Sequence, residues 1–259
     1  MTGIISIGIG GIAGWKIVQR SEDRQIAAVE ADPVVQRSTE YFREKIGGVS
    51  GAAELVKDYR LLSTALSAFG LEDDIANKAF IQKILESDTS DKNSLVNRLS
   101  DKRYLRMAEA FGFGGAKPAG DLGEVVGKAF VQREFERRIG EGDENLRLAL
   151  NARRELEGLA GRTSSDKTLW YEVMGNPPLR KVFEGAFGFG KTYGQLDVDR
   201  QLDEFMKASE RYLGTASFAD LTQPDTIDRL IVNFMARSQI ETGGAQNRYS
   251  TALTLLSGM

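Results

Sequence analysis

The sequence predicts an all-α protein, and three observations carry that prediction. In most segments after residue 20, apolar residues recur at spacings of three and four, the period of a helix with one buried face. Residues that begin and end helices flank these segments, such as Asn176 before two prolines and Gly70 after an apolar run. No set of segments alternates apolar and polar residues as strands do. We therefore expect a bundle-like globule of roughly ten to twelve helices.

In the first half of the chain, the expected helices have clear boundary signals. Asp32 followed by Pro33 opens one helix, because aspartate caps free N–H groups and proline is tolerated in the first turn. Gly70 closes another, since glycine readily adopts the left-handed conformation at a helix end. The helices expected before the Gly- and Pro-rich loop 112–120 span 33–46, 52–69, 73–85, 93–99 and 102–111.

Capping residues also mark the second half. Asn176 precedes two prolines, and Thr222 opens a segment that resembles a capping box. Gly243 and Gly244 are expected to end the last long helix and to leave an amphipathic piece at 248–256. The helices expected after the loop span 122–139, 144–159, 166–174, 177–187, 197 or 199 to 214, and 222–240.

These patterns predict three parts. Residues 1–20 form a Gly-rich, apolar N-terminal arm, residues 21–242 form an all-α domain with internal repeats, and residues 243–259 form an amphipathic tail. Loop 112–120 is the candidate boundary within the domain. Chain ends of this kind either dock on their own domain or contact a partner, and the sequence leaves both open.

An Ala-Phe-Gly triplet ends three apolar runs, at 68–70, 110–112 and 186–188. The first two triplets precede nearly identical strings, KAFIQ at 78–82 and KAFVQ at 128–132. The triplets are unevenly spaced, and the strings diverge after a few residues. We therefore expect a decayed duplication within one globule and no solenoid of regular period.

Composition narrows the classes of function. The 259 residues are 41% hydrophobic, with 34 basic and 37 acidic residues and a net charge of -3, so no basic field exists to hold nucleic acid. The absence of Cys excludes disulfides, thiolate nucleophiles and Cys-ligated zinc, and the absence of His removes the commonest general base and metal ligand. We expect no enzyme and assign no catalytic, cofactor-binding or metal-binding residue.

The apolar run 3–15 is the only candidate for a targeting segment. A membrane-spanning helix needs about 20 apolar residues, and Lys16 interrupts this run. No basic residue precedes it, as a secretory signal would require. We therefore expect no membrane insertion and a chain made in the cytoplasm.

Residues 185–192 match the P-loop pattern G-x-x-x-x-G-K-[ST] at every position, through Gly185, Gly190, Lys191 and Thr192. In a P-loop, backbone N–H groups wrap the phosphates, the lysine reaches the outer phosphates and the threonine holds magnesium. That loop must follow a buried strand, whereas here a predicted helix precedes it. We favour a helix end and keep a nucleotide hydrolase as an alternative.

Three other patterns have simpler structural interpretations. Residues 8–13 match a dinucleotide-binding G-x-G-x-x-A run, but no later strands can build its sheet, so a loose arm is favoured. The acidic run 197–204 lacks the glycine and glutamate of a calcium loop, and the cluster 72–74 likewise predicts no metal site. Phe111 and Phe187 are expected in the core, whereas Phe113 and Phe189 are candidates for a contact surface.

Several strings together resemble one helical family of unknown biochemical role, found mainly in alphaproteobacteria and often encoded among flagellar genes. The resemblance covers about residues 25–240. It implies an association with flagellum assembly or motility, and it implies no catalytic residue. The strings that carry it are DYRLL at 58–62, AFGL at 68–71, NRLSDKRY at 97–104, MGNPPLR at 174–180 and LDVDRQL at 196–202.

The leading hypothesis is therefore a non-enzymatic structural or assembly protein of the bacterial flagellum that acts through contacts with flagellar proteins. Its expected contact surfaces are residues 3–15 and 248–256, because both ends are apolar and lie outside the repeated helices. Flagellar axial proteins tend to be helical and Cys-poor and are exported without a cleaved signal, so export through the flagellar apparatus is one expectation. A cytoplasmic export chaperone or scaffold that binds a helical segment is the alternative.

Overall fold

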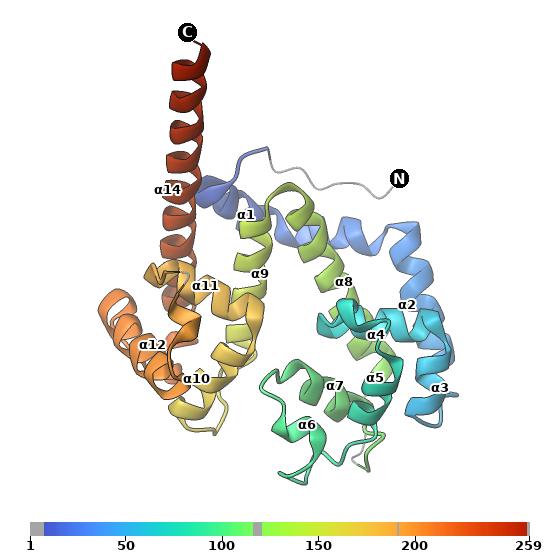
Figure 1. The fold of residues 1–259 in the computed structure, drawn as a ribbon. Coiled ribbons are helices and arrows are strands. Elements are labelled where there is room, and N and C mark those ends of the chain that lie inside the picture. Colours follow the sequence, from blue (N-terminus) through green and yellow to red (C-terminus); the bar gives the residue numbers. More distant parts are fainter. Residues whose placement is uncertain (1–7, 116–120, 191, 258–259) are drawn as a thin grey trace. The chain divides into compact units, whose positions relative to one another are not determined.

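The computed structural model describes residues 8–115, 121–190 and 192–257, and the side chains up to residue 240. Within these ranges the chain forms fourteen α-helices and two short 3-10 helices and contains no strand, which confirms the all-α prediction (Figure 1). The helices divide into two compact units. Of the described residues, unit 1 contains 21–142, and unit 2 contains 143–257 together with 8–20, which include the first half of helix α1 (Gly11–Glu30).

Unit 1 is built around α4, which packs against α8 and α2. The helix α4 also contacts α3, η1 and α7, and α5 packs against α3 and α7. The helices of unit 1 after α1 are α2 (Pro33–Ile46), α3 (Ala52–Lys57), α4 (Tyr59–Phe69), the 3-10 helix η1 (Glu72–Asp74), α5 (Lys78–Leu85), α6 (Leu95–Arg98), α7 (Arg103–Phe111) and α8 (Leu122–Gly142).

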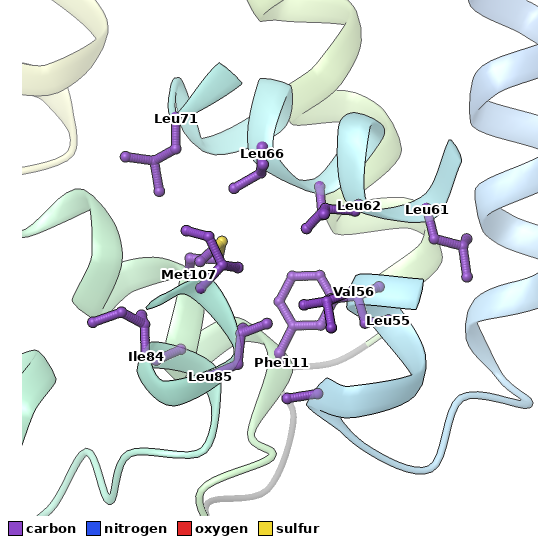
Figure 2. Close-up of a cluster of buried hydrophobic side chains, with 14 of the residues drawn as sticks. Leu55, Val56, Leu61, Leu62, Leu66, Leu71, Ile84, Leu85, Met107 and Phe111 are labelled. Atoms are coloured by element: carbon purple, nitrogen blue, oxygen red, sulfur yellow. The ribbon is translucent and has the colours of Figure 1, made fainter. Parts of the chain in front are cut away.

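The core of unit 1 gathers around Phe111, whose side chain is fully buried. Figure 2 shows the ring of Phe111 beside side chains from α3, α4 and α5, among them Leu55, Leu62 and Leu85. The ring also meets Phe42 edge-on, with 6.4 Å between the centroids. The residue before the second Ala-Phe-Gly glycine is thus a core residue, as the sequence predicts.

Unit 2 is built around α11, which packs against α14 and α9. Its core is aromatic: Trp170 lies within 6.0 Å of Phe183, Phe205 and Phe218, measured between ring centroids. The helices of unit 2 after α1 are α9 (Glu144–Glu157), α10 (Asp166–Gly175), α11 (Pro177–Phe187), the 3-10 helix η2 (Tyr193–Gln195), α12 (Val198–Leu213), α13 (Phe218–Leu221) and α14 (Pro224–Ser257).

The central helices α4 and α11 match each other closely. Each has 11 residues, each begins after a residue whose side chain caps it (Asp58 and Asn176), and each ends at a glycine with positive φ. Those glycines, Gly70 at φ 70 and Gly188 at φ 72, close the first and third Ala-Phe-Gly triplets. An arginine of the long helix α8 or α14 lies against each glycine. The internal repeat therefore has a structural counterpart in these two helices.

The second triplet also ends a helix, because Gly112 caps α7 with φ 67. The KAFIQ and KAFVQ strings, in contrast, are not structural equivalents. Residues 78–82 open the short helix α5, whereas residues 128–132 lie in the interior of α8. Their similarity reflects a shared helical preference and not a shared place in the fold.

The expected helix over 52–69 is broken at Asp58, which corrects that prediction. The backbone of Asp58 is extended, and its side chain accepts hydrogen bonds from the N–H groups of Arg60 and Leu61 and from the hydroxyl of Tyr41. The aspartate side chain accepts hydrogen bonds from free N–H groups at the start of a new helix. This local hydrogen bonding competes with a continuous helix through residue 58. The expected helix over 73–85 similarly separates into η1 and α5.

The last helix is longer than the sequence predicts. The two glycines at 243 and 244 do not end it, and α14 continues to Ser257. Each interior glycine costs about 1 kcal/mol relative to alanine, which weakens a helix without forbidding it. No helix in the described ranges is both long and apolar enough to cross a membrane.

Candidate functional site

The start of α1 is not a loose arm, because it packs onto α14 and α9 in unit 2. Trp15 and Val18 are fully buried. Figure 1 shows the first turns of α1 beside α14. Residues 11–20 of the expected arm are therefore part of a helix, with Trp15 as its main apolar anchor, and residues 1–7 lie outside the described ranges.

Asp228 on α14 is the polar anchor of this contact. Its carboxylate accepts hydrogen bonds from Trp15 Nε1 at 3.0 Å and from Gln19 Nε2 at 3.1 Å, and it pairs with Lys16 Nζ at 2.9 Å. Burial raises the pKa of the Asp228 carboxyl, but the hydrogen bonds from Trp15 and Lys16 outweigh it and hold the pKa below its ordinary value. We call the set Trp15, Lys16, Gln19 and Asp228 the Asp228 clamp.

Gly11, within the dinucleotide-like run 8–13, and Gly14, just after it, serve this packing. A Cβ atom at Gly11 would collide with the side chain of Gln239 on α14, and one at Gly14 would collide with the Ile9 carbonyl and touch Leu146 on α9. A dinucleotide-binding fold also needs an acidic residue about 20 positions after the run. Of the two residues near that place, Glu30 and Asp32, Asp32 instead caps α2 by accepting a hydrogen bond from Val34 N at 2.8 Å. These residues are thus placed by helix packing and capping.

The Asp228 clamp makes stability depend on pH. A carboxyl with a lowered pKa in the folded state contributes stability above its ordinary pKa and loses it as the pH falls through the folded value. We expect Asp228→Asn to lower the urea midpoint of unfolding at neutral pH. The difference from wild type should shrink as the pH falls below about 3.8. A difference that stays constant between pH 7 and pH 3 would contradict the assigned role of the carboxylate.

The P-loop-like run lies at the end of α11. Two of its described glycines have structural roles, and the third, Gly190, has none that the structure shows. Gly185 is inside the helix, and a Cβ there would lie 2.7 Å from the ring of Phe234. Gly188 is the left-handed cap against Arg237, and Gly190 has open space around it. A helix precedes the run where a P-loop needs a strand. Lys191 lies outside the described ranges.

Two glycine variants separate the two interpretations of this run. If Gly188 is a helix cap, Gly188→Ala should lower the free energy of unfolding by about 1–2 kcal/mol, because the left-handed backbone conformation costs a residue with a Cβ atom that much. Gly190→Ala should change it by less than about 0.5 kcal/mol. In a P-loop, Gly190 would be essential and position 188 variable. Chemical unfolding and a nucleotide-binding assay on both variants decide between them, and loss of binding only in Gly190→Ala would favour the P-loop.

The acidic residues considered as a calcium site and the phenylalanines considered as a contact surface also have structural roles. Asp197 caps α12 by accepting a hydrogen bond from Asp199 N at 2.9 Å. No group of three or more metal-ligating side chains occurs among the residues that the structure describes. Phe187 is buried as expected, whereas Phe113 and Phe189 are half-buried and pack against the aromatic side chains beside them.

A cavity of about 300 Å³ in unit 1 was not predicted from the sequence. It lies between α1, α2 and α8, and the ion pair between Arg43 and Glu124, at 2.7 Å, is in its wall. On α8, Gly127 has no side chain to fill the cavity. One turn earlier, the lack of a side chain at Gly123 allows α2 to pack closely at Arg43. Two glycines four residues apart on one helix were the only sequence signal for it.

Fold and contacts define a two-unit helical protein whose first helix is clamped onto its last. Residues 68–227 match the model of a family described as protein of unknown function (DUF1217), and the chain belongs to that family. A protein of the alphaproteobacterium Agrobacterium tumefaciens, solved by X-ray crystallography in structural genomics, is similar. It is 29% identical, with a TM-score of 0.74 over 88% of this chain and 93% of its own. No curated protein matches the chain.

Proposed function

We propose that this protein is a non-enzymatic structural or assembly component of the bacterial flagellum and acts through contacts with other proteins. The observation that carries the proposal is the extension of α14. Among its side chains up to residue 240, which the structure describes, Met235 is the last that is buried, and Ile240 is 72% exposed. The helix then continues to Ser257, about 25 Å further at 1.5 Å per residue.

The extended part of α14 is suited to contact with a partner helix. Figure 1 shows α14 continuing past the other helices of unit 2. Its sequence over 248–256 has apolar residues at helical spacing, which is typical of a helix that buries one face. An isolated helix of this length is marginal in water and gains most of its stability from packing. The flagellar assignment rests on the resemblance of the sequence strings to a family often encoded among flagellar genes.

Culture fractionation of a tagged chain tests the flagellar assignment. We expect the chain outside the cell when the flagellar export apparatus works, and only inside the cell when the apparatus is disabled. A cytoplasmic export chaperone or scaffold would stay inside the cell in both strains. Retention in both strains, with no flagellar protein bound to the chain, would contradict the proposal.

A further inference from the structure

Unit 1 and unit 2 are each built on the same frame of three helices. In unit 1, α4 packs against α2 and α8, and in unit 2, α11 packs against α9 and α14. The helices α2 and α9 each have 14 residues, and each begins after a capping aspartate and ends at a glycine. Arg133 of α8 lies against Gly70, which ends α4. Arg237 of α14 lies against Gly188, which ends α11. These features fix which positions of the two units correspond.

The cavity of unit 1 lies at positions that unit 2 fills with large apolar side chains. Thr39 of α2 and Leu150 of α9 both lie seven residues after the capping aspartate. Gly127 of α8 and Ile231 of α14 both lie six residues before the arginine that contacts the glycine. Leu150 and Ile231 are buried, whereas Thr39 and Gly127 line the cavity. The smaller residues of unit 1 therefore leave a space of about 300 Å³ that unit 2 lacks at these positions.

The interior of the cavity is apolar. Val131 and Gly127 in its lining are buried, and Ile26 is half-buried. The hydroxyl of Thr39 donates to the Val35 carbonyl of its own helix at 3.1 Å, so this polar group is already engaged. An apolar group that enters the cavity is removed from water, and this burial favours binding.

The rim of the cavity carries two acidic and two basic side chains. Arg43 and Glu124 form an ion pair at 2.7 Å. Glu30 and Lys128 are exposed, and neither is paired with another charged group within the described part of the chain. The rim thus offers one free carboxylate and one free ammonium group beside an apolar interior. A ligand that complements both carries an ammonium and a carboxylate group of its own.

We propose that the cavity between α1, α2 and α8 binds a free α-amino acid with an apolar side chain. The side chain of the ligand enters the space left by Gly127 and Thr39, its ammonium group pairs with Glu30, and its carboxylate pairs with Lys128. A volume of about 300 Å³ lies at the lower end of the range for small-molecule sites and suits a ligand of this size. The site requires no flagellar component, so this proposal and the flagellar assignment can fail independently.

Isothermal titration calorimetry of the full chain with leucine, methionine and phenylalanine tests the class of ligand. We expect at least one of them to bind. The best binder is then compared with glycine, with the amine that lacks its carboxylate, and with the acid that lacks its amino group. Each of these should bind at least about tenfold more weakly, because each loses apolar burial or one charge-assisted hydrogen bond. Binding by none of the three amino acids, or equal binding by the amine or the acid, would overturn the proposal.

Gly127→Ile assigns the binding to this cavity, because it places the corresponding residue of unit 2 there. A Cβ at Gly127 meets only ordinary contacts at 3.8 and 4.0 Å, and isoleucine favours a helix more than glycine does. We expect a folded chain, checked by circular dichroism, that no longer binds the amino acid. Gly47→Ile is the matched control, since a Cβ at the end of α2 meets nothing within 4 Å, and it should bind as wild type does. Binding that survives Gly127→Ile would overturn the proposal.

Lys128→Met tests the charge at the rim without altering the interior, because Lys128 is exposed. We expect this variant to bind the amino acid at least about tenfold more weakly than wild type does. Its affinity for the amine that lacks the carboxylate should not change. Unchanged affinity for the amino acid, or an equal loss of affinity for the amine, would contradict the pairing with Lys128 and overturn the proposal.

Discussion

Replacing Phe187 by alanine is expected to lower the free energy of unfolding by about 3–5 kcal/mol, the cost of truncating a buried phenylalanine. Phe187 is 3% exposed. Its ring centroid lies 5.6 Å from that of Phe183, 6.3 Å from that of Phe205 and 5.9 Å from that of Tyr212. Its loss would leave a cavity in the aromatic core of unit 2 that these rings cannot fill without moving. Chemical unfolding monitored by circular dichroism measures the change.

Phe187→Leu is the matched control, because it keeps most of the volume and should cost less than about 1.5 kcal/mol. Lys191→Ala tests the rival interpretation of the same segment. A nucleotide hydrolase would lose nucleotide binding in Lys191→Ala, whereas a helix end predicts no effect on binding. A small loss of stability in Phe187→Ala, together with a nucleotide-binding defect in Lys191→Ala, would contradict our account of residues 185–192.

Trp15→Ala is expected to cost about 3–5 kcal/mol as well. The side chain is fully buried, and its indole N–H donates to Asp228 at 3.0 Å, so the variant loses apolar burial and leaves the carboxylate without one donor. The control is Ile17→Ala on the same helix, where the side chain is 41% exposed and the cost should be much smaller. Equal stabilities of the two variants in urea unfolding would show that α1 is not anchored as we describe.

Much of the fold could be predicted from the sequence, because capping chemistry is local. Asp32, Asn176 and the three Ala-Phe-Gly glycines act within a few residues of themselves, and each marks the helix boundary that the sequence predicts. The apolar spacing likewise predicts Phe111 and Phe187 in the core. These features need no knowledge of distant contacts.

The errors arose where distant contacts decide the structure. Asp58 ends one helix and begins another partly because Tyr41, 17 residues earlier, donates to it. The Asp228 clamp joins positions more than 200 residues apart, and neither the tryptophan nor the aspartate alone predicts the other. The Gly-rich character of residues 8–14 therefore favoured a loose arm from the sequence, although Gly11 permits close packing against α14 and Gly14 against α9.

Ending the chain after Ile240 in its own host shows whether the protein works through contacts of its extended helix. That variant keeps every side chain of α14 that the structure describes as buried, the last of which is Met235. We predict a folded protein and altered swimming motility, and we expect flagellar proteins to co-purify with the full chain and not with the truncated one. Unchanged motility and unchanged co-purification, with the truncated chain present at normal level, would contradict the account.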